Sequence, residues 1–306
     1  MNNLTELPKI GLALGSGASR GWSHIGVIKA LLKEGIEPNI VCGTSVGAIV
    51  GGAYVAGNLE KLEHWVSDSK RSDVLRFFSV NFSQSGFVDA ERLNWFLHNY
   101  IAAKDQRIED MLKKFAAVST NLDTGREVWL KKGGLADAVR ASMALPGLFP
   151  AVRNGQRWLV DGGLMNPVPV TTCRALGADV VIAVNLNSGI IGKRNNGRQE
   201  TASTENNGVL GKVKQQAKEY SNSIFPNRDE KDQAPGLFYA IANSINIVQD
   251  RITRSRLAGD PADVLLSPRL AQIGMLEFHR AAEAIKEGED CVLKALDEIR
   301  RVTRKQ

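Results

Sequence analysis

The chain has 306 residues, of which 43% are hydrophobic and 24% charged, and its formal net charge of +6 gives a pI near 9.2. This composition is typical of a globular protein and excludes a fibrous or wholly disordered chain. Its three cysteines, Cys42, Cys173 and Cys291, are widely spaced, which excludes a disulfide framework and a cysteine-based metal site and fits a reducing cytoplasm.

The excess of basic residues favours an anionic partner. Because these residues are scattered and no DNA- or RNA-binding motif is present, the sequence predicts no nucleic-acid partner and favours weak attraction to an anionic phospholipid surface. Residues 1–8 form a short tail without the apolar segment of a secretory signal. We therefore expect a cytoplasmic protein, for which peripheral contact with the inner membrane face and the oligomeric state stay open.

A glycine-rich loop separates a predicted buried strand at 9–14 from a predicted amphipathic helix that ends at Gly35. Such a loop presents backbone N–H groups at a helix N-terminus, where a phosphate or an oxyanion is stabilised. A dinucleotide site is disfavoured, because the third glycine falls one residue late and no acidic residue ends the second strand. We expect an oxyanion hole instead, formed by Gly15, Ser16, Gly17, Ala18, Ser19, Arg20 and Gly21.

The stretch 40–57, IVCGTSVGAIVGGAYVAG, contains a serine between two glycines, Gly43 and Gly47, after a β-branched run. This is the G-x-S-x-G pattern of a nucleophile elbow, in which the strand turns sharply into a helix and exposes the hydroxyl of Ser45. A transmembrane helix over the same uncharged stretch is the alternative. Its glycines, alanines and hydroxyl groups dilute its hydrophobicity, so we favour the elbow.

Further along, Phe77, Phe78, Phe82 and Phe87 cluster without a clear period, which suits either core packing beneath a long connection or an apolar lip for an acyl chain. Residues 115–130 predict a hairpin, and LADAVRASMA predicts a short helix. The two prolines of Leu145–Pro150 then predict an apolar loop.

A second predicted hairpin turns at Asn154-Gly155 and leads directly into Asp161-Gly162-Gly163. An aspartate at a strand end beside glycines is well placed for a catalytic carboxylate. Residues 178–186 predict another buried strand, and strands that alternate with helices imply a mostly parallel sheet covered on both faces.

The C-terminal third changes character twice. The polar composition of 190–235 predicts a disordered or lid-like insertion. Residues 236–306 return to helical patterns and are expected to pack on the same domain as the catalytic core, 9–189. The predicted packing face of the last long element comprises Phe278, Ala281, Ala282, Ile285, Leu293, Leu296 and Ile299.

A serine hydroxyl needs a base within hydrogen-bond reach, and a desolvated Asp161 aimed at Ser45 could serve as one. The backbone N–H groups of Gly17 and Ala18 would receive the charge that develops on the ester oxygen. A triad with His279, or His24 as the base, is the mechanistic alternative. Arg20 suits either binding of a lipid phosphate or anchoring of the loop.

Four motifs in this order, GSGASRGWSHIGVIKAL, GTSVGAIVGG, ASMALPGLFPAV and VDGGLMNPVPV, resemble the patatin-like phospholipases. The segment ITRSRLAGDPADVLLSP further resembles small bacterial members of the RssA type, related to the catalytic domain of neuropathy target esterase. The resemblance implies a three-layer α/β/α fold, Ser45 as nucleophile, Asp161 as its partner and the glycine-rich loop as oxyanion hole.

The expected function is therefore that of a serine lipid-acyl hydrolase acting on a phospholipid or lysophospholipid, with no metal or organic cofactor. A low-turnover regulatory or lipid-binding protein on the same fold is the alternative.

Overall fold

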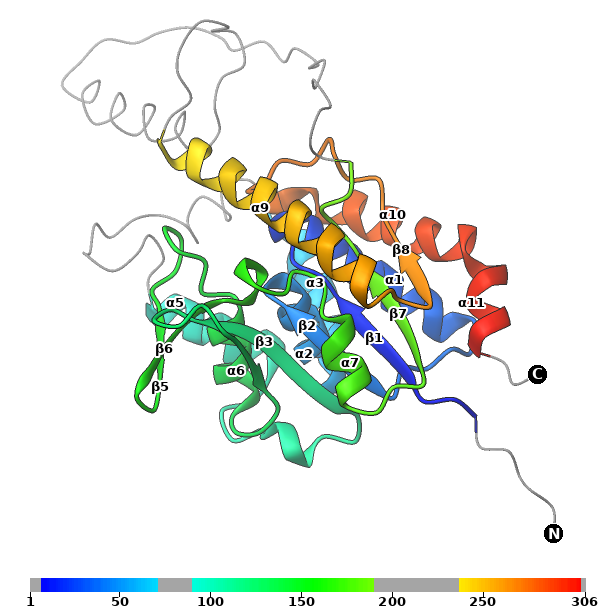
Figure 1. Ribbon diagram of the computed structural model, residues 1–306, viewed down its shortest axis with the longest axis horizontal. Coiled ribbons are helices and arrows are strands. Elements are labelled where there is room, and N and C mark those ends of the chain that lie inside the picture. Colours follow the sequence, from blue (N-terminus) through cyan, green and yellow to red (C-terminus); the bar gives the residue numbers. More distant parts are fainter. Residues whose placement is uncertain (1–6, 71–89, 190–236, 304–306) are drawn as a thin grey trace, which may run out of the picture.

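The computed structural model describes residues 7–70, 90–189 and 237–303 (Figure 1). The phenylalanine cluster between Phe77 and Phe87 and the insertion predicted for 190–235 lie outside the described residues, as does most of the N-terminal tail.

A single sheet of eight strands forms the centre of the molecule: β1 (Ile10–Leu14), β2 (Ile40–Thr44), β3 (Lys114–Asn121), β4 (Glu127–Leu130), β5 (Val152–Asn154), β6 (Arg157–Asp161), β7 (Val180–Val184) and β8 (Val264–Leu266). The spatial order is β5-β6-β3-β2-β1-β7-β8, and β4 also pairs with β3. Strands β3, β2, β1, β7 and β8 pair in parallel, whereas β4, β5 and β6 add antiparallel pairs at the β3 end. The sheet is mostly parallel, as predicted.

Helices cover both faces of this sheet: α1 (Ser23–Lys33), α2 (Val46–Val55), α3 (Leu59–Asp68), α5 (Ala90–Phe96), α6 (Leu135–Ser142), α7 (Val170–Ala175), α9 (Leu237–Gly259), α10 (Ala281–Lys294) and α11 (Leu296–Thr303). Shorter turns are η1 (Ala18–Trp22), η2 (Leu97–Ile101), η3 (Ile108–Asp110), η4 (Gly162–Leu164) and η5 (Phe278–Arg280). In Figure 1, α7 and α9 cross the near face, while α1, α2 and α10 lie behind the strands. The predicted three-layer α/β/α fold is confirmed.

Strand β1 shows why the central strands are apolar along their whole length. Alternate side chains of a strand point to opposite faces. Leu12 and Leu14 pack in the large core under α1 and α2, whereas Ala13 packs in a second core with Val170 and Cys173 of α7. Both faces of the strand are therefore buried against apolar side chains. For this reason the run IGLAL does not alternate between apolar and polar residues.

Two glycines allow α1 to pack closely against α10. A Cβ on Gly26 would lie 1.9 Å from the carbonyl oxygen of Ile285, and one on Gly288 would lie 2.0 Å from that of Ser23. Helix α1 ends as predicted, because Gly35 follows it with a left-handed φ of 73°. This contact fixes the helix that follows the glycine-rich loop.

The C-terminal predictions need correction. Strand β8 interrupts the expected helical region, and Phe278 lies in the η5 turn before α10 begins. Ala282 is exposed and Leu293 is 51% exposed, so neither belongs to the packing face. The face of α10 that packs on the core comprises instead Ala281, Ala284, Ile285, Gly288 and Val292, which turns Ala282 and Leu293 toward solvent. A separate break at Ala295 divides α10 from α11.

The transmembrane alternative for 40–57 is wrong, because this stretch is divided between β2 and α2. Within the described residues, no helix combines the length and apolar character needed to cross a bilayer.

Candidate active site

The chain reverses direction sharply at Ser45, between β2 and α2, with φ 58° and ψ −122°. A Cβ on Gly43 would lie 2.4 Å from the carbonyl oxygen of Gly47, and one on Gly47 would lie 2.1 Å from that of Leu14. Only glycine tolerates such approaches. The two glycines therefore permit a turn that leaves the serine at the N-terminus of α2, where the helix dipole is positive.

The structure brings Ser45 and Asp161 together from strands that are not neighbours in the sequence. Ser45 Oγ donates a hydrogen bond of 2.5 Å to Asp161 Oδ2. The second carboxylate oxygen, Oδ1, accepts the N–H of Gly163 at 2.7 Å. Both oxygens are thus engaged, one by the hydroxyl and one by the backbone, which holds the carboxylate in a single orientation.

Asp161 is buried, with 1% of its surface exposed. This desolvation raises the pKa of Asp161 to about 6, against the opposing effect of the hydrogen bonds from Ser45 and Gly163. The carboxylate is therefore a stronger base than an exposed aspartate and is still ionised at neutral pH. The backbone of Asp161 is fixed as well. The Asp161 N–H donates to the Ala144 carbonyl, and Thr120 Oγ1 donates to the Asp161 carbonyl, both at 2.9 Å.

The loop from Gly15 to Gly21 passes beside the serine, and the N–H groups of its first six residues fall into two sets. Those of Gly15, Ser16, Ser19 and Arg20 donate to backbone carbonyls. Among the described residues, no acceptor contacts the N–H groups of Gly17 and Ala18. Ala18 has a left-handed φ of 50° and lines the same cavity as Ser45. Within the described residues, these two N–H groups of the loop therefore stay without a hydrogen bond.

Gly21 connects this loop to the elbow. A Cβ on Gly21 would lie 2.2 Å from both methyl carbons of Val46, the first residue of α2. The loop and the elbow are thus in direct contact.

Buried side chains from distant elements hold the loop in place. Arg20, 2% exposed, donates through Nε to the Gly17 carbonyl at 3.1 Å and through its terminal nitrogen to Asn246 Oδ1 on α9 at 3.2 Å. Burial lowers the pKa of Arg20 to about 10, so it keeps its charge at neutral pH. Of its two alternative roles, these contacts favour anchoring of the loop.

Ser45 bonds directly to Asp161, without a histidine between them. His24, fully buried, bonds through Nε2 to the Gly15 carbonyl at 2.8 Å, and burial lowers its pKa to about 4. It braces the loop as a neutral ring. His279 lies in η5, and both oxygens of Asp161 are already engaged by Ser45 and Gly163. The direct bond between Ser45 and Asp161 favours a two-residue arrangement over a triad.

Three residues that contact the site escaped the sequence analysis: Ser142, Asn187 and Gln249. Ser142 of α6 accepts the N–H of Ser45 at 3.0 Å and donates to the Val118 carbonyl. Gln249 of α9 accepts from Ser16 Oγ at 3.1 Å, and Asn187 donates to Gln249 Oε1 at 3.3 Å. Ser142 falls in the motif ASMALPGLFPAV, which could have drawn attention to it. No local signal distinguishes Gln249 from other helical glutamines.

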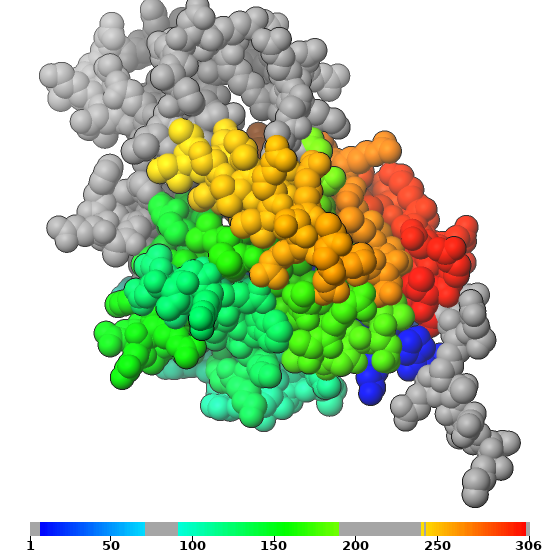
Figure 2. Space-filling model, in the orientation of Figure 1, coloured from blue at the N-terminus to red at the C-terminus, as the bar shows by residue number. Residues whose placement is uncertain are grey.

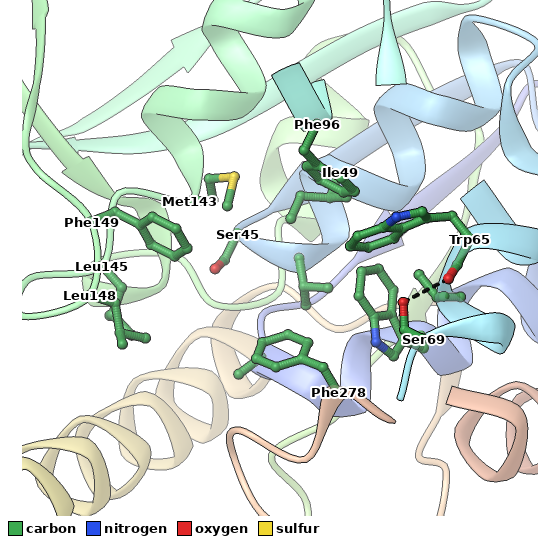
Figure 3. Close-up of a pocket in the computed structure, with 14 residues that line it drawn as sticks. Ser45, Ile49, Trp65, Ser69, Phe96, Met143, Leu145, Leu148, Phe149 and Phe278 are labelled. Atoms are coloured by element: carbon green, nitrogen blue, oxygen red, sulfur yellow. Dashed lines mark hydrogen bonds between the residues drawn. The ribbon is translucent and has the colours of Figure 1, made fainter. Parts of the chain in front are cut away.

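Ser45 lines an apolar cavity whose wall comes from the loop, α2, α3, α5, the 143–149 segment and η5. In Figure 3 the Ser45 hydroxyl lies beside Phe149, Met143 lies on the other side of Ser45, and Trp65, Phe96 and Phe278 line the remaining wall. The lining is Ala18, Trp22, Ser45, Val46, Ile49, Trp65, Val66, Ser69, Phe96, Met143, Leu145, Leu148, Phe149 and Phe278. Such a surface suits a hydrocarbon chain.

Three features characterise the site: a serine in a strained turn, its hydrogen bond to a buried aspartate, and a glycine-rich loop beside it on a mostly parallel sheet. Together they are typical of a serine hydrolase site. The model of the patatin-like phospholipase family matches residues 12–174, and the chain belongs to that family.

Relatives refine this placement. An uncharacterised NTE family protein of Mycobacterium bovis is 31% identical over 95% of this chain and 92% of its own length. Lysophospholipases named NTE1 from Emericella nidulans and Yarrowia lipolytica are 32% and 34% identical, each over 58% of this chain. The matched region makes up only 12% and 13% of those two proteins. The chain is thus similar to NTE-related members of the family.

Proposed function

We propose that this protein is a serine lipid-acyl hydrolase that cleaves carboxylic esters of phospholipids or lysophospholipids. The observation that carries the proposal is the hydrogen bond to the buried Asp161 from the Oγ of Ser45, a residue that lines an apolar cavity. Membership of the patatin-like phospholipase family and similarity to proteins named lysophospholipases support the same chemistry.

In the first step, Ser45 Oγ attacks the ester carbonyl carbon while Asp161 Oδ2 takes the hydroxyl proton. The negative charge moves to the former carbonyl oxygen, which would be received by the N–H groups of Gly17 and Ala18. The positive charge of Arg20, which is bonded to the Gly17 carbonyl, favours an anion at this loop. The intermediate collapses to an acyl-serine, and Asp161 returns the proton to the departing alcohol.

In the second step, a water molecule attacks the acyl-serine with Asp161 again as base. The tetrahedral intermediate expels Ser45, which regains its proton from Asp161, and a fatty acid is released. One carboxylate with a pKa near 6 serves both steps, because it is ionised at rest and basic enough to accept a proton.

The cavity indicates where the acyl chain binds. Its aromatic and aliphatic wall would exclude water from the hydrocarbon, whereas a phosphorylated head group would stay outside. We propose that the enzyme acts on lipids presented in aggregates or bilayers, and that one acyl chain enters the cavity at a time.

The test is hydrolysis of short- and long-chain p-nitrophenyl esters and of lysophosphatidylcholine by the wild type, Ser45→Ala and Asp161→Asn. We expect Ser45→Ala to fall to background and Asp161→Asn to lose about 10²–10⁴-fold in kcat, since the general base is lost. His279→Ala is the matched control and should keep wild-type activity. A fluorophosphonate probe should label the wild type but not Ser45→Ala.

Two outcomes would overturn the proposal. A folded Asp161→Asn protein with most of its activity would exclude the dyad. Lipid binding without Ser45-dependent turnover or labelling would favour the regulatory or lipid-binding alternative.

A further inference from the structure

The hairpin formed by β5 and β6 carries an exposed aromatic and basic surface. Trp158 of β6 is 42% exposed, and it lies opposite Arg153 of β5. The guanidinium carbon of Arg153 lies 5.7 Å from the centre of the Trp158 ring, within the range of a cation–π contact. Residues directly opposite each other in an antiparallel pair project to the same face, so the two side chains form one surface.

The turn between β3 and β4 extends this surface. Leu122, 55% exposed, donates its N–H to the Trp158 carbonyl at 2.8 Å, one position beyond the paired residues Asn121 and Leu159. Leu122, Trp158 and Arg153 therefore stand in one row across three strands. We call these three residues, together with Arg157, which is adjacent to Trp158 in β6 and projects to the other face of the hairpin at its tip, the hairpin row.

The charge of this region is positive. Arg153 and Arg157 are both exposed, and in the adjacent turn the charges of Arg126 and Asp123 offset each other. The carboxylate of Glu127 in β4 is bound by Arg256 at 2.7 Å, so it does not cancel the hairpin arginines. An exposed tryptophan and leucine beside arginines is a pattern suited to the interface of an anionic bilayer.

The hairpin is joined to the active site at both ends. The segment before β5 contains Leu145, Leu148 and Phe149, which line the cavity. Strand β6 ends at Asp161, three residues after Trp158, which is a rise of about 10 Å along a strand. Figure 1 shows β5 and β6 projecting from the end of the sheet farthest from α11, and in Figure 2 the green surface of this part of the chain forms the lower left edge.

We propose that the hairpin row docks this protein on an anionic phospholipid bilayer and thereby brings the cavity to its substrate. The choice of partner rests on the proposed lipid hydrolase function. Trp158 and Leu122 would insert among the head groups, and Arg153 and Arg157 would bind the lipid phosphates. Docking would bring membrane lipids close to the cavity and would leave the reaction at Ser45 unchanged.

The first test measures co-sedimentation with vesicles of phosphatidylcholine, with and without phosphatidylglycerol. The wild type should bind the anionic vesicles more tightly, and salt should weaken this binding. Arg153→Gln with Arg157→Gln should weaken binding to anionic vesicles about 30-fold. Lys131→Gln with Lys132→Gln is the matched control: it removes the same charge from exposed positions at the other end of β4 and should change binding less than about threefold.

The second test addresses the apolar half of the surface. Trp158→Ser and Leu122→Ser should each weaken binding about tenfold, whereas Leu112→Ser, which removes a fully exposed leucine before β3, should not. Equal losses in the hairpin variants and their controls, or no loss in the hairpin variants, would overturn the proposal.

The third test separates docking from chemistry. The Arg153→Gln, Arg157→Gln protein should hydrolyse a soluble short-chain ester at the wild-type rate, but should lose activity on vesicle substrates in proportion to its lost binding. A parallel fall on the soluble ester would contradict a docking role. Because vesicle binding is measured without turnover, failure of the proposed hydrolase function and failure of the docking surface give distinguishable results.

Discussion

The elbow at Ser45 and the loop from Gly15 to Gly21 lie side by side, each follows a parallel strand, and each contains a non-glycine residue with positive φ. The elbow is held by backbone approaches at Gly43 and Gly47, within a few residues or on the adjacent strand. The loop is held by side chains of α9 more than 200 residues away, Asn246 and Gln249. The turn at the elbow therefore depends mainly on close backbone approaches, whereas the loop depends on a long-range polar network.

The largest effect is expected for Gly47→Ala, which tests whether close backbone approach holds the elbow. Its new Cβ would lie 2.1 Å from the Leu14 carbonyl oxygen, a backbone atom that cannot yield without moving β1. We expect a loss of more than about 4 kcal/mol in the free energy of unfolding, measured by urea denaturation.

Gly51→Ala in the same helix is the control for Gly47→Ala. Its Cβ would meet only side chains, at 3.0 Å or more, and alanine has the higher helix propensity. Its stability should stay within about 1 kcal/mol of the wild type. Equal losses in the two variants would show that backbone approach is not what holds the elbow.

The next effect concerns the loop. Arg20→Met leaves the Gly17 carbonyl and Asn246 Oδ1 without this donor and removes a buried charge. The N–H groups of Gly17 and Ala18 then lose their fixed orientation, so we expect kcat to fall about 10–100-fold, less than for loss of an oxyanion donor outright. Arg254→Met, which removes an arginine on α9 whose side chain is 68% exposed, should leave kcat unchanged. Similar losses in both variants would mean that α9, and not the loop contact, is affected.

The third prediction distinguishes the elbow from the loop by the pH dependence of kcat/KM. Since the pKa of Asp161 is raised to about 6 by burial, kcat/KM should fall about tenfold per pH unit below pH 6 and stay level above it. Arg20→Met should lower the plateau without moving this limb, because N–H donors do not titrate. If Arg20→Met shifted the acidic limb of the kcat/KM profile by a full pH unit, the loop would also affect the base, contrary to this prediction.

The same raised pKa affects folding. Protonated Asp161 is favoured in the folded state, so its contribution to stability is complete below about pH 4 and is lost as the pH rises through about 6, a change of about 3 kcal/mol. Asp161→Asn should lack this dependence in pH-dependent denaturation.

The smallest effect is expected at Gln249. Gln249→Leu and Ser16→Ala each remove one side of the 3.1 Å hydrogen bond between the loop and α9, and each should lower kcat about 3–10-fold with little change in KM. If the two residues act through this bond, the double variant should lose no more than either single variant. Additive losses would show that they act independently.

Much of the fold was predictable because its signals are local. The apolar run of β1, the glycine after α1 and the G-x-S-x-G turn each depend on neighbours within a few positions. The G-x-S-x-G pattern and the later Asp-Gly-Gly, each at the end of a predicted strand, together with the family resemblance, named Ser45 and Asp161 as candidate site residues. Local patterns did not predict β8 or the break at Ala295, since a three-residue strand and a helix break are set by what they pack against.

The amino-acid sequence by itself determined where the chain must turn, because only glycine fits at Gly43 and Gly47 and only one serine lies between them. The tertiary structure decided what surrounds that serine. The 2.5 Å bond to Asp161, the support from Ser142 and the anchoring of the loop by Asn246 and Gln249 join segments separated by 97 to 233 residues. Such contacts form only when β2, β6, α6 and α9 pack together, and it is this packing that buries Asp161 and raises its pKa.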